Sequence, residues 1–178
     1  MKIKAFNNEV LFAAEANSAV GPRELKSLKT KVVHNKRKRI RLCMHRDVDD
    51  NLHEMLIVLT KDAYIRPHKH LTKVESYHVI EGLADLIGFD DAGCVTETVR
   101  LGDHGSGHAF YYRTSSSGYH TLLVRSDFLV FHETTNGPFN QKDSIAAPWA
   151  PDDQDQAAGR IFMKRVARTA RSLTGKQA

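Results

Sequence analysis

The stretch RPHKHLTKVE at residues 66–75 decides which fold and which chemistry we expect of this chain. Side chains two apart on a strand point to the same face, so His68 and His70 are predicted to lie together. A short turn would bring Glu75 back on a neighbouring antiparallel strand, facing the same interior. Two imidazoles and a carboxylate suit a divalent transition metal better than calcium or magnesium, which take mostly oxygen ligands.

The full spacing of this motif is far more specific than its histidine pair alone. With 10 histidines among 178 residues, a His-x-His pair arises by chance about 0.6 times in such a chain. Requiring Glu75 and Gly82 at their fixed positions lowers the expectation to about 0.002. We therefore interpret His68, His70 and Glu75 as metal ligands rather than as polar residues of a solvated surface hairpin.

Short apolar runs separated by turn residues surround the motif. Strands are predicted at residues 55–59, 75–80, 83–89, 95–101, 120–124 and 128–134. Residues 90–93, with the sequence DDAG, form a hairpin-type connection between two of them. Several short strands at near-regular spacing indicate an all-β sandwich or barrel, with residues such as Leu86 and Leu122 facing inward.

The two ends of the chain have helical patterns instead. Pro22 suits a first helical turn and is followed by apolar residues at helical spacing. After residue 137 the strand patterns stop, and Phe162, Val166 and Ala170 later form one stripe of a terminal helix. The expected units are an N-terminal helical extension at 1–36, a barrel at 37–152 and a basic C-terminal helix or tail at 153–178.

The motif resembles the first cupin motif, which has the form His-x-His, four residues, Glu, six residues, Gly. His120, in the stretch SGYHT at residues 117–121, stands where the second cupin motif has its last ligand. More narrowly, the chain is similar to the WbuC-type cupin-fold metalloproteins, which are named after a member of a polysaccharide gene cluster. The matching pieces lie at residues 37–45, 64–75, 89–93, 119–121 and 133–151.

This resemblance implies a cupin double-stranded β-helix, that is, a jelly-roll barrel, with short helices near both termini. It implies one divalent transition-metal ion held by His68, His70, Glu75 and His120, with iron, manganese, zinc and nickel not distinguished. It also implies a role in surface-polysaccharide or nucleotide-sugar metabolism. Because cupin-like sandwiches often pair through edge strands, a homodimer is expected.

Three residues near the motif are candidates for catalytic roles. Lys73 has the same strand parity as Glu75, so its ammonium either leans over the metal mouth, to bind an anion or donate a proton, or is a solvated turn lysine. Tyr64 and Tyr77 are candidate proton carriers. Glu133 and Lys142 lie in the matching pieces, but the sequence assigns them no role.

The chain's positive charge is concentrated in two segments. The 26 basic and 21 acidic residues give a net charge of +5, much of it in residues 36–41 and 164–171. Arg37, Arg39, Arg41 and the later His45 alternate in and after the first of these, a pattern that favours a solvated edge strand. Neither segment carries interleaved aromatic residues or a nucleic-acid motif, so a nucleic-acid partner is not expected.

Cysteine content and apolar run lengths predict a cytoplasmic location. Cys43 and Cys94 match neither a disulfide framework nor a zinc pattern, and they are expected to be reduced thiols. The apolar run at residues 10–14 is too short and too closely flanked by glutamates for a signal peptide. No segment approaches the roughly 20 apolar residues that span a bilayer, so no membrane partner is expected.

Together these features predict a metalloenzyme acting on a small anionic or sugar-like molecule, such as a sugar or a keto acid. Open positions on the ion would chelate neighbouring substrate oxygens or bind dioxygen. A metal-dependent isomerase, epimerase or dioxygenase is therefore the enzyme hypothesis. The alternative is a non-catalytic, metal-dependent module that binds or senses a small molecule, which a closed site without an exchangeable water would favour.

Overall fold

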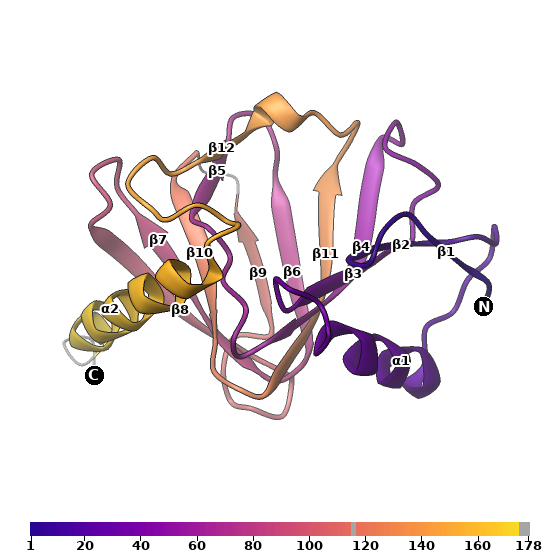
Figure 1. The fold of residues 1–178 in the computed structure, drawn as a ribbon, viewed down its shortest axis with the longest axis horizontal. Helices are drawn as coiled ribbons and strands as arrows, with labels where there is room; N and C mark the ends of the chain where they lie inside the picture. Colours follow the sequence, from indigo (N-terminus) through magenta and orange to yellow (C-terminus); the bar gives the residue numbers. More distant parts are fainter. Residues whose placement is uncertain (115–116, 175–178) are drawn as a thin grey trace.

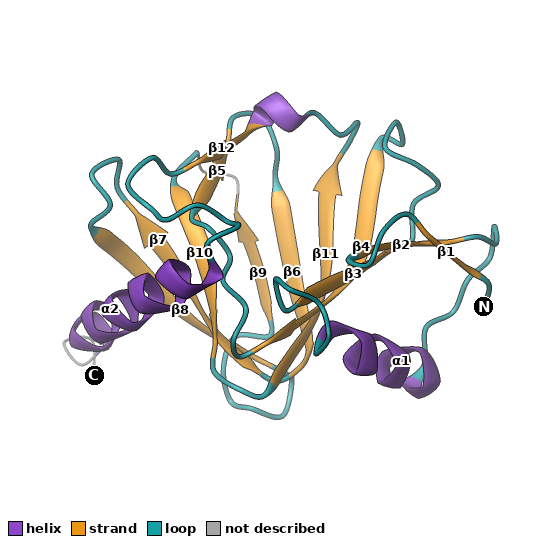
Figure 2. Cartoon of the chain, in the orientation of Figure 1, coloured by secondary structure: helices purple, strands orange, loops and turns teal. Residues whose placement is uncertain are grey.

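A computed structural model describes residues 1–114 and 117–174 of the chain (Figure 1). Strands dominate it, and the two longer helices lie on opposite sides of the strands (Figure 2). The described strands are β1 (Ile3–Ala5), β2 (Val10–Ala13), β3 (Arg39–Cys43), β4 (Leu52–Thr60), β5 (His68–His70), β6 (Glu75–Glu81), β7 (Leu83–Phe89), β8 (Val95–Gly102), β9 (Tyr111–Thr114), β10 (Tyr119–Val124), β11 (Phe128–Asn136) and β12 (Ser144–Ala146). The described helices are α1 (Pro22–Val32), the short 3-10 helix η1 (Gln141–Asp143) and α2 (Gln156–Thr174).

Strands β4 to β11 form a jelly roll. One sheet contains the order β4-β11-β6-β9, and the facing sheet contains the order β5-β10-β7-β8. The chain changes sheet at each connection between these strands except the predicted β7–β8 hairpin. Two four-stranded sheets connected in this way define the jelly-roll fold that cupins share. The predicted all-β cupin architecture, a double-stranded β-helix with short helices near the ends, is therefore confirmed.

Alternating side chains along the strands build the interior. In β6, Glu75, Tyr77 and Val79 are buried between the sheets, whereas His78 is exposed on the other face. An apolar cluster that includes Tyr77 and Val79 fills the rest of the space between the sheets. Its buried members are Leu59, Tyr77, Val79, Ala84, Leu86, Leu101, Leu122, Val124, Leu129 and Phe131. The predicted inward positions of Leu86 and Leu122 are confirmed.

Each long helix covers the outer face of one sheet. α1 begins at Pro22, as predicted, and the Glu24 carboxylate accepts a hydrogen bond from the Gly21 backbone N–H at 3.0 Å, which caps the helix start. Its Leu28 and Val32 pack on outward residues of β3, β4 and β11. α2 packs on the outward face of the other sheet, and no helix in the described ranges is long and apolar enough to cross a membrane.

The N-terminal segment adds strands that the sequence did not reveal. β2 pairs with β3 in parallel, and β1 continues the same sheet, which therefore has seven strands. The prediction that Arg37, Arg39 and Arg41 belong to a solvated edge strand is wrong, because β3 lies between β2 and β4. Strands of three or four residues carry too little periodicity to be recognised from sequence.

The segment after residue 137 was also predicted without strands, and that prediction is wrong. β12 pairs with β5 and extends the second sheet to five strands. Trp149 in the following loop packs against Phe89, with ring centroids 5.1 Å apart, and so closely against Gly93 that a Cβ atom there would lie 2.8 Å from the indole ring. Gly93 also has a positive φ of 86°, a conformation that favours glycine. Residues 175–178 of the predicted basic tail lie outside the described residues.

Candidate metal centre

Four polar side chains converge at one end of the space between the sheets. His68 and His70 come from β5, His120 from the adjacent strand β10, and Glu75 from the first position of β6. Each offers one ligand atom, and these atoms all lie within 4.8 Å of one another. The prediction that Glu75 lies on a strand next to β5 is wrong, because β6 belongs to the facing sheet. The carboxylate therefore approaches the imidazoles from the opposite wall.

The backbone fixes the ring orientation of two of these histidines. His68 Nδ1 lies 2.9 Å from the Arg66 carbonyl oxygen, and His120 Nδ1 lies 3.3 Å from that of Gly118. A carbonyl oxygen only accepts hydrogen bonds, so each Nδ1 carries the proton when the ring is neutral. The lone pair then resides on Nε2, the atom that faces the cluster. This arrangement is the usual one for histidine ligands of metals.

His70 is the least satisfied polar group of the four. Its Nε2 lies 3.0 Å from Glu75 Oε1, but not in the direction of a hydrogen bond. In the described ranges neither ring nitrogen of this buried side chain has a hydrogen-bond partner. Its Nδ1 lies 3.7 Å from Asp143 Oδ2, which also lacks a partner there. A buried imidazole left in this state costs free energy, and a cation at the cluster would relieve that cost.

Charges inside the cluster shift the pKa values of its members. Burial lowers the pKa of His68 to about 4, so this ring is neutral at physiological pH. Burial alone would raise the pKa of Glu75, but contacts with the imidazoles of His120 and His70 outweigh it and hold that pKa well below its usual value. Burial alone would lower the pKa of His120, but its contact with Glu75 raises it. The contacts between Glu75 and the imidazoles thus favour the ionised carboxylate and the protonated form of His120.

Tyr77 supports the carboxylate from the same strand. Its hydroxyl donates to Glu75 Oε2 at 2.6 Å and lies 3.5 Å from His120 Nε2. Burial, together with the charge of Glu75, raises the pKa of Tyr77 well above its ordinary value. The phenol therefore keeps its proton and acts as a fixed hydrogen-bond donor. Tyr77 lies at the cluster, as the sequence predicted, but its environment suits positioning rather than proton abstraction.

The cluster opens into a cavity of about 730 Å³, which is lined by both sheets and by the N-terminal segment. This volume is in the range of small-molecule sites. Lys73 lines the cavity from the β5–β6 connection, and its ammonium lies 5.2 Å from the centre of the Phe139 ring. Of the two alternatives for Lys73, the structure places it at the cavity rather than on an unrelated solvated turn.

Glu133 contributes a second carboxyl group to the cavity wall. It lies on β11, directly across from Tyr77 on β6. Burial, followed by repulsion from Glu75, raises the pKa of Glu133 to about 8. Its carboxyl group therefore holds a proton at neutral pH, as acid–base residues of enzymes often do. The sequence had assigned Glu133 no role.

Tyr64, the third candidate for catalysis, does not reach the cavity. It is fully buried under α2, where its hydroxyl donates to the Pro151 carbonyl oxygen at 2.9 Å. A Cβ atom on Gly159 of α2 would lie 2.1 Å from the ring, so the helix and the tyrosine are in close contact. Tyr64 therefore anchors α2, and its prediction as a proton carrier is not supported. Lys142 is exposed on η1.

Asp143 is a residue of the site that was not predicted from the sequence. It ends η1, and its Oδ1 accepts hydrogen bonds from the Thr72 backbone N–H at 2.9 Å and from the Thr72 hydroxyl at 2.7 Å. It thereby holds the β5–β6 connection while its other oxygen faces His70. A lone aspartate in a loop predicted to be irregular carries no signal that it lies beside a histidine 73 positions away in sequence.

Sequence comparisons match part of this chain to one family model. The model, described as a domain of unknown function, DUF6016, matches residues 20–101. The match includes His68, His70 and Glu75 and ends before His120. The comparison with curated proteins found no match.

Solved structures show distant likenesses. A mutant of the Bacillus subtilis oxalate decarboxylase is 18% identical over 56% of this chain and 25% of its own, with a TM-score of 0.44. A structural-genomics protein from Shewanella oneidensis is 13% identical over 58% of this chain and 66% of its own, with a TM-score of 0.46. An HTH_3 family transcriptional regulator from Vibrio cholerae is 18% identical over 57% and 52%, with a TM-score of 0.41. Because the sequence identities and TM-scores are this low, these likenesses assign no activity to the chain.

Proposed function

We propose that the chain is a metal-dependent cupin enzyme that holds one divalent transition-metal ion with His68, His70, Glu75 and His120. The buried, unpartnered imidazole of His70, with three other ligand atoms within 4.8 Å, supports this most directly. Three imidazoles and one carboxylate suit iron, manganese, zinc or nickel. When bound, such an ion supplies Lewis-acid polarisation of a substrate oxygen.

Glu133 is the proton carrier in this proposal. A carboxyl group with a pKa of about 8 is protonated at neutral pH, yet close enough to that pH to donate and accept protons in turn. It lies on the same cavity wall as Tyr77, which orients Glu75. A proton carrier beside the candidate metal centre favours an isomerase or epimerase over a dioxygenase, because the former reactions move a substrate proton.

Lys73 binds the negative charge of the substrate near the cavity mouth. Its ammonium lines the cavity and lies against the ring of Phe139. We expect Lys73→Met to leave metal content unchanged and to weaken the binding of anionic ligands. Lys73→Arg should restore part of that binding, since arginine keeps the charge.

Elemental analysis of protein purified without an affinity tag tests the metal site. About one transition-metal ion per chain is expected, and the double variant His68→Ala, His70→Ala should contain none. His78→Ala is the matched control, because His78 lies on β6 but is exposed on its outer face. A wild-type protein that is metal-free and cannot be reloaded would contradict the proposal. So would equal metal loss in the control.

The finer parts of the proposal follow the resemblance to WbuC-type proteins. They comprise a sugar-like or keto-acid substrate, a role in surface-polysaccharide metabolism, a cytoplasmic location and a homodimer formed through edge strands. A screen of sugars and keto acids with the metal-loaded protein tests the substrate class, and light scattering tests the dimer. Tight binding without turnover across that screen would favour the non-catalytic binding or sensor module instead.

A further inference from the structure

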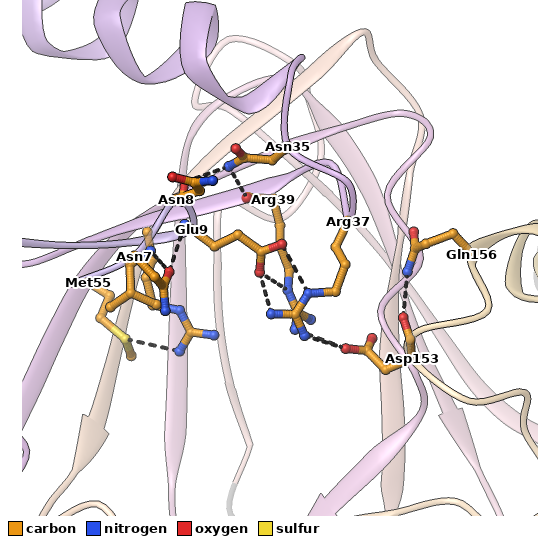
Figure 3. Close-up of polar contacts among 11 residues, drawn as sticks. Asn7, Asn8, Glu9, Asn35, Arg37, Arg39, Met55, Asp153 and Gln156 are labelled. Atoms are coloured by element: carbon orange, nitrogen blue, oxygen red, sulfur yellow. Dashed lines mark hydrogen bonds and ion pairs between the residues drawn. The ribbon is translucent and has the colours of Figure 1, made fainter. Parts of the chain in front are cut away.

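A second group of charged side chains lines the same cavity on its other side. Arg39 and Arg41 of β3 point to the inner face of the seven-stranded sheet and contribute to the cavity wall. Figure 3 shows the polar contacts in this region, where Arg39 of β3 and the preceding Arg37 contact Glu9 and Asp153. The three arginines of this segment are not equivalent, and the difference identifies a binding group.

Arg37 and Arg39 are neutralised by carboxylates. Arg37 Nη1 and Arg39 Nη2 lie 2.7 Å and 3.0 Å from Asp153 Oδ2. Glu9 contacts both guanidinium groups as well, with Arg37 Nε donating to its Oε1 at 3.0 Å. These two arginines therefore tie the N-terminal segment to the loop before α2, and they have little charge left for a ligand.

Arg41 has no carboxylate partner in the part of the chain that the structure describes. The guanidinium group contacts the Met55 sulfur, a weak acceptor, with 3.9 Å between Nη1 and the sulfur atom. The side chain is half-buried and lines the cavity. A guanidinium that is partly removed from water and unpaired is costly, so this position is prepared for an anion that arrives with a ligand.

The surface between Arg41 and the candidate metal centre is largely apolar, although Glu133 of β11 also lines the cavity there. Arg41 lies across from Ile57 on β4, which lies across from Phe131 on β11, and Met55 is the next inward residue on β4. All of these side chains line the cavity. Three strand spacings separate β3 from β6, which carries Glu75, so the two ends are about 14 Å apart along the sheet.

We propose that Arg41 binds the carboxylate of an elongated acid whose middle is apolar and whose other end lies at the histidine cluster. The unpaired charge near Arg41 is a single positive one, which matches a carboxylate better than a phosphate with its charge of about −1.5 to −2. A two- or three-carbon acid is too short to reach both ends of the cavity. The assignment of the chelating end rests on the proposed metal site, whereas the role of Arg41 stands on its own contacts.

Isothermal titration calorimetry with two matched probes tests this inference. The probes are 2-oxooctanoate and 2-oxooctanedioate, which share a chelating 2-oxo-acid head and differ only in the terminal carboxylate. With the metal-loaded protein, we expect the diacid to bind more tightly by on the order of tenfold, as one charge-assisted hydrogen-bond pair would give. Arg41→Gln should abolish this preference while metal content stays unchanged, and Arg41→Lys should retain part of it.

Arg100→Gln is the control for loss of one positive charge, because Arg100 is exposed on β8 and does not line the cavity. Equal affinities of the two probes for the wild-type protein would overturn the inference, even with the metal fully bound. So would an unchanged preference in Arg41→Gln.

Failure of the metal site is a separate outcome. Octanoate, which has no chelating head, is therefore also titrated into the metal-free protein. Binding that Arg41→Gln weakens would retain the inference without the metal. Octanoate binding that is absent, or that Arg41→Gln leaves unchanged, would overturn it.

Discussion

Two polar clusters lie at the same cavity, and they differ in how their charges are paired. The histidine cluster consists of His68, His70, Glu75 and His120, and the arginine cluster consists of Arg37, Arg39, Glu9 and Asp153. At the arginine cluster, Glu9 and Asp153 neutralise Arg37 and Arg39, so each charged group meets an opposite charge. At the histidine cluster, some buried donors and acceptors lack partners. His70 keeps two unpartnered ring nitrogens, and Asp143 keeps an unpartnered carboxylate oxygen in the described ranges.

This difference separates a structural polar cluster from a binding site. A buried network that is fully satisfied fixes the chain in place, and little is gained by adding a ligand to it. A buried network that is only partly satisfied gains free energy when a ligand completes it. Arg41 resembles the histidine cluster in this respect, although it is adjacent in space and sequence to the satisfied arginines. The pairing of charges, rather than residue type, separates Arg41 from Arg37 and Arg39.

The largest expected effect is on metal affinity when a ligand of the histidine cluster is changed. Glu75→Gln keeps the size of the side chain but removes its charge, and it should lower metal affinity by at least about 100-fold, since even residues behind the ligands are worth 10- to 100-fold. Metal titration monitored by calorimetry measures this. The matched variant Glu9→Gln, at the arginine cluster, should bind metal as the wild type does. Equal losses in both would erase the distinction between the clusters.

A second effect concerns Glu133, between the two clusters. The pKa of its carboxyl group is about 8 in the folded protein against an ordinary value of 4.5, so the folded state holds this proton more tightly than the unfolded chain. The stability that comes with the protonated group is present below pH 4.5 and is lost as pH rises to about 8. Glu133→Gln does not titrate, so at pH 9 it should be more stable than the metal-free wild type by on the order of 5 kcal/mol.

Thermal melts of both proteins in a chelator, from pH 5 to pH 9, measure that difference. The gap between their melting temperatures should widen through this range and level off above pH 8. Parallel curves would mean that the Glu133 carboxyl group titrates at its ordinary value, and the proton-carrier role would then be lost.

A third, smaller effect is expected at Asp143, which lies behind His70. Asp143→Asn removes the negative charge that faces His70 Nδ1 at 3.7 Å while keeping an oxygen for Thr72. We expect metal affinity to fall by about tenfold, the lower end of what such supporting carboxylates contribute. Asp91→Asn is the control, because exposed Asp91 pairs with Lys69, which lies next to His70 on β5. Unchanged affinity in Asp143→Asn would remove Asp143 from the site.

The sequence predicted the parts of the molecule that depend on local pattern. Alternating residues marked β6 and β11, and the spacing of His68, His70 and Glu75 marked the cluster. Each of these signals lies within one short window. The jelly roll follows from them only through the resemblance to cupins, because strand order depends on contacts between distant segments.

The parts that failed are those that depend on pairing between distant segments. Glu75 was placed on a neighbouring strand because a hairpin is the simplest path after a turn, whereas the chain crosses to the facing sheet. Arg41 was assigned to a solvated edge because nothing in the alternation of Arg37, Arg39 and Arg41 reveals that β2 covers the edge. Tyr64 was made a proton carrier because it is a tyrosine near the motif, and only the structure shows it beneath α2.

The smallest expected effect is on stability, at the arginine cluster. Asp153→Asn leaves Arg37 and Arg39 without one of their two carboxylates, and Glu9 then faces both alone. These groups are partly exposed, with Asp153 at 24% and Arg37 at 27% side-chain exposure, so the loss should be about 1 kcal/mol rather than the larger cost of breaking a fully buried pair. For a chain of this size, that lowers the melting temperature by about 2–4 °C. Asp152→Asn, one residue away, is the matched control, because Asp152 is 65% exposed and forms an exposed ion pair with Arg66, while asparagine keeps an oxygen for the Gln154 backbone N–H; its melting temperature should hardly change. Both variants should keep full metal content; a loss of metal in Asp153→Asn would show that the two sides of the cavity are coupled and that the arginine cluster is more than structural.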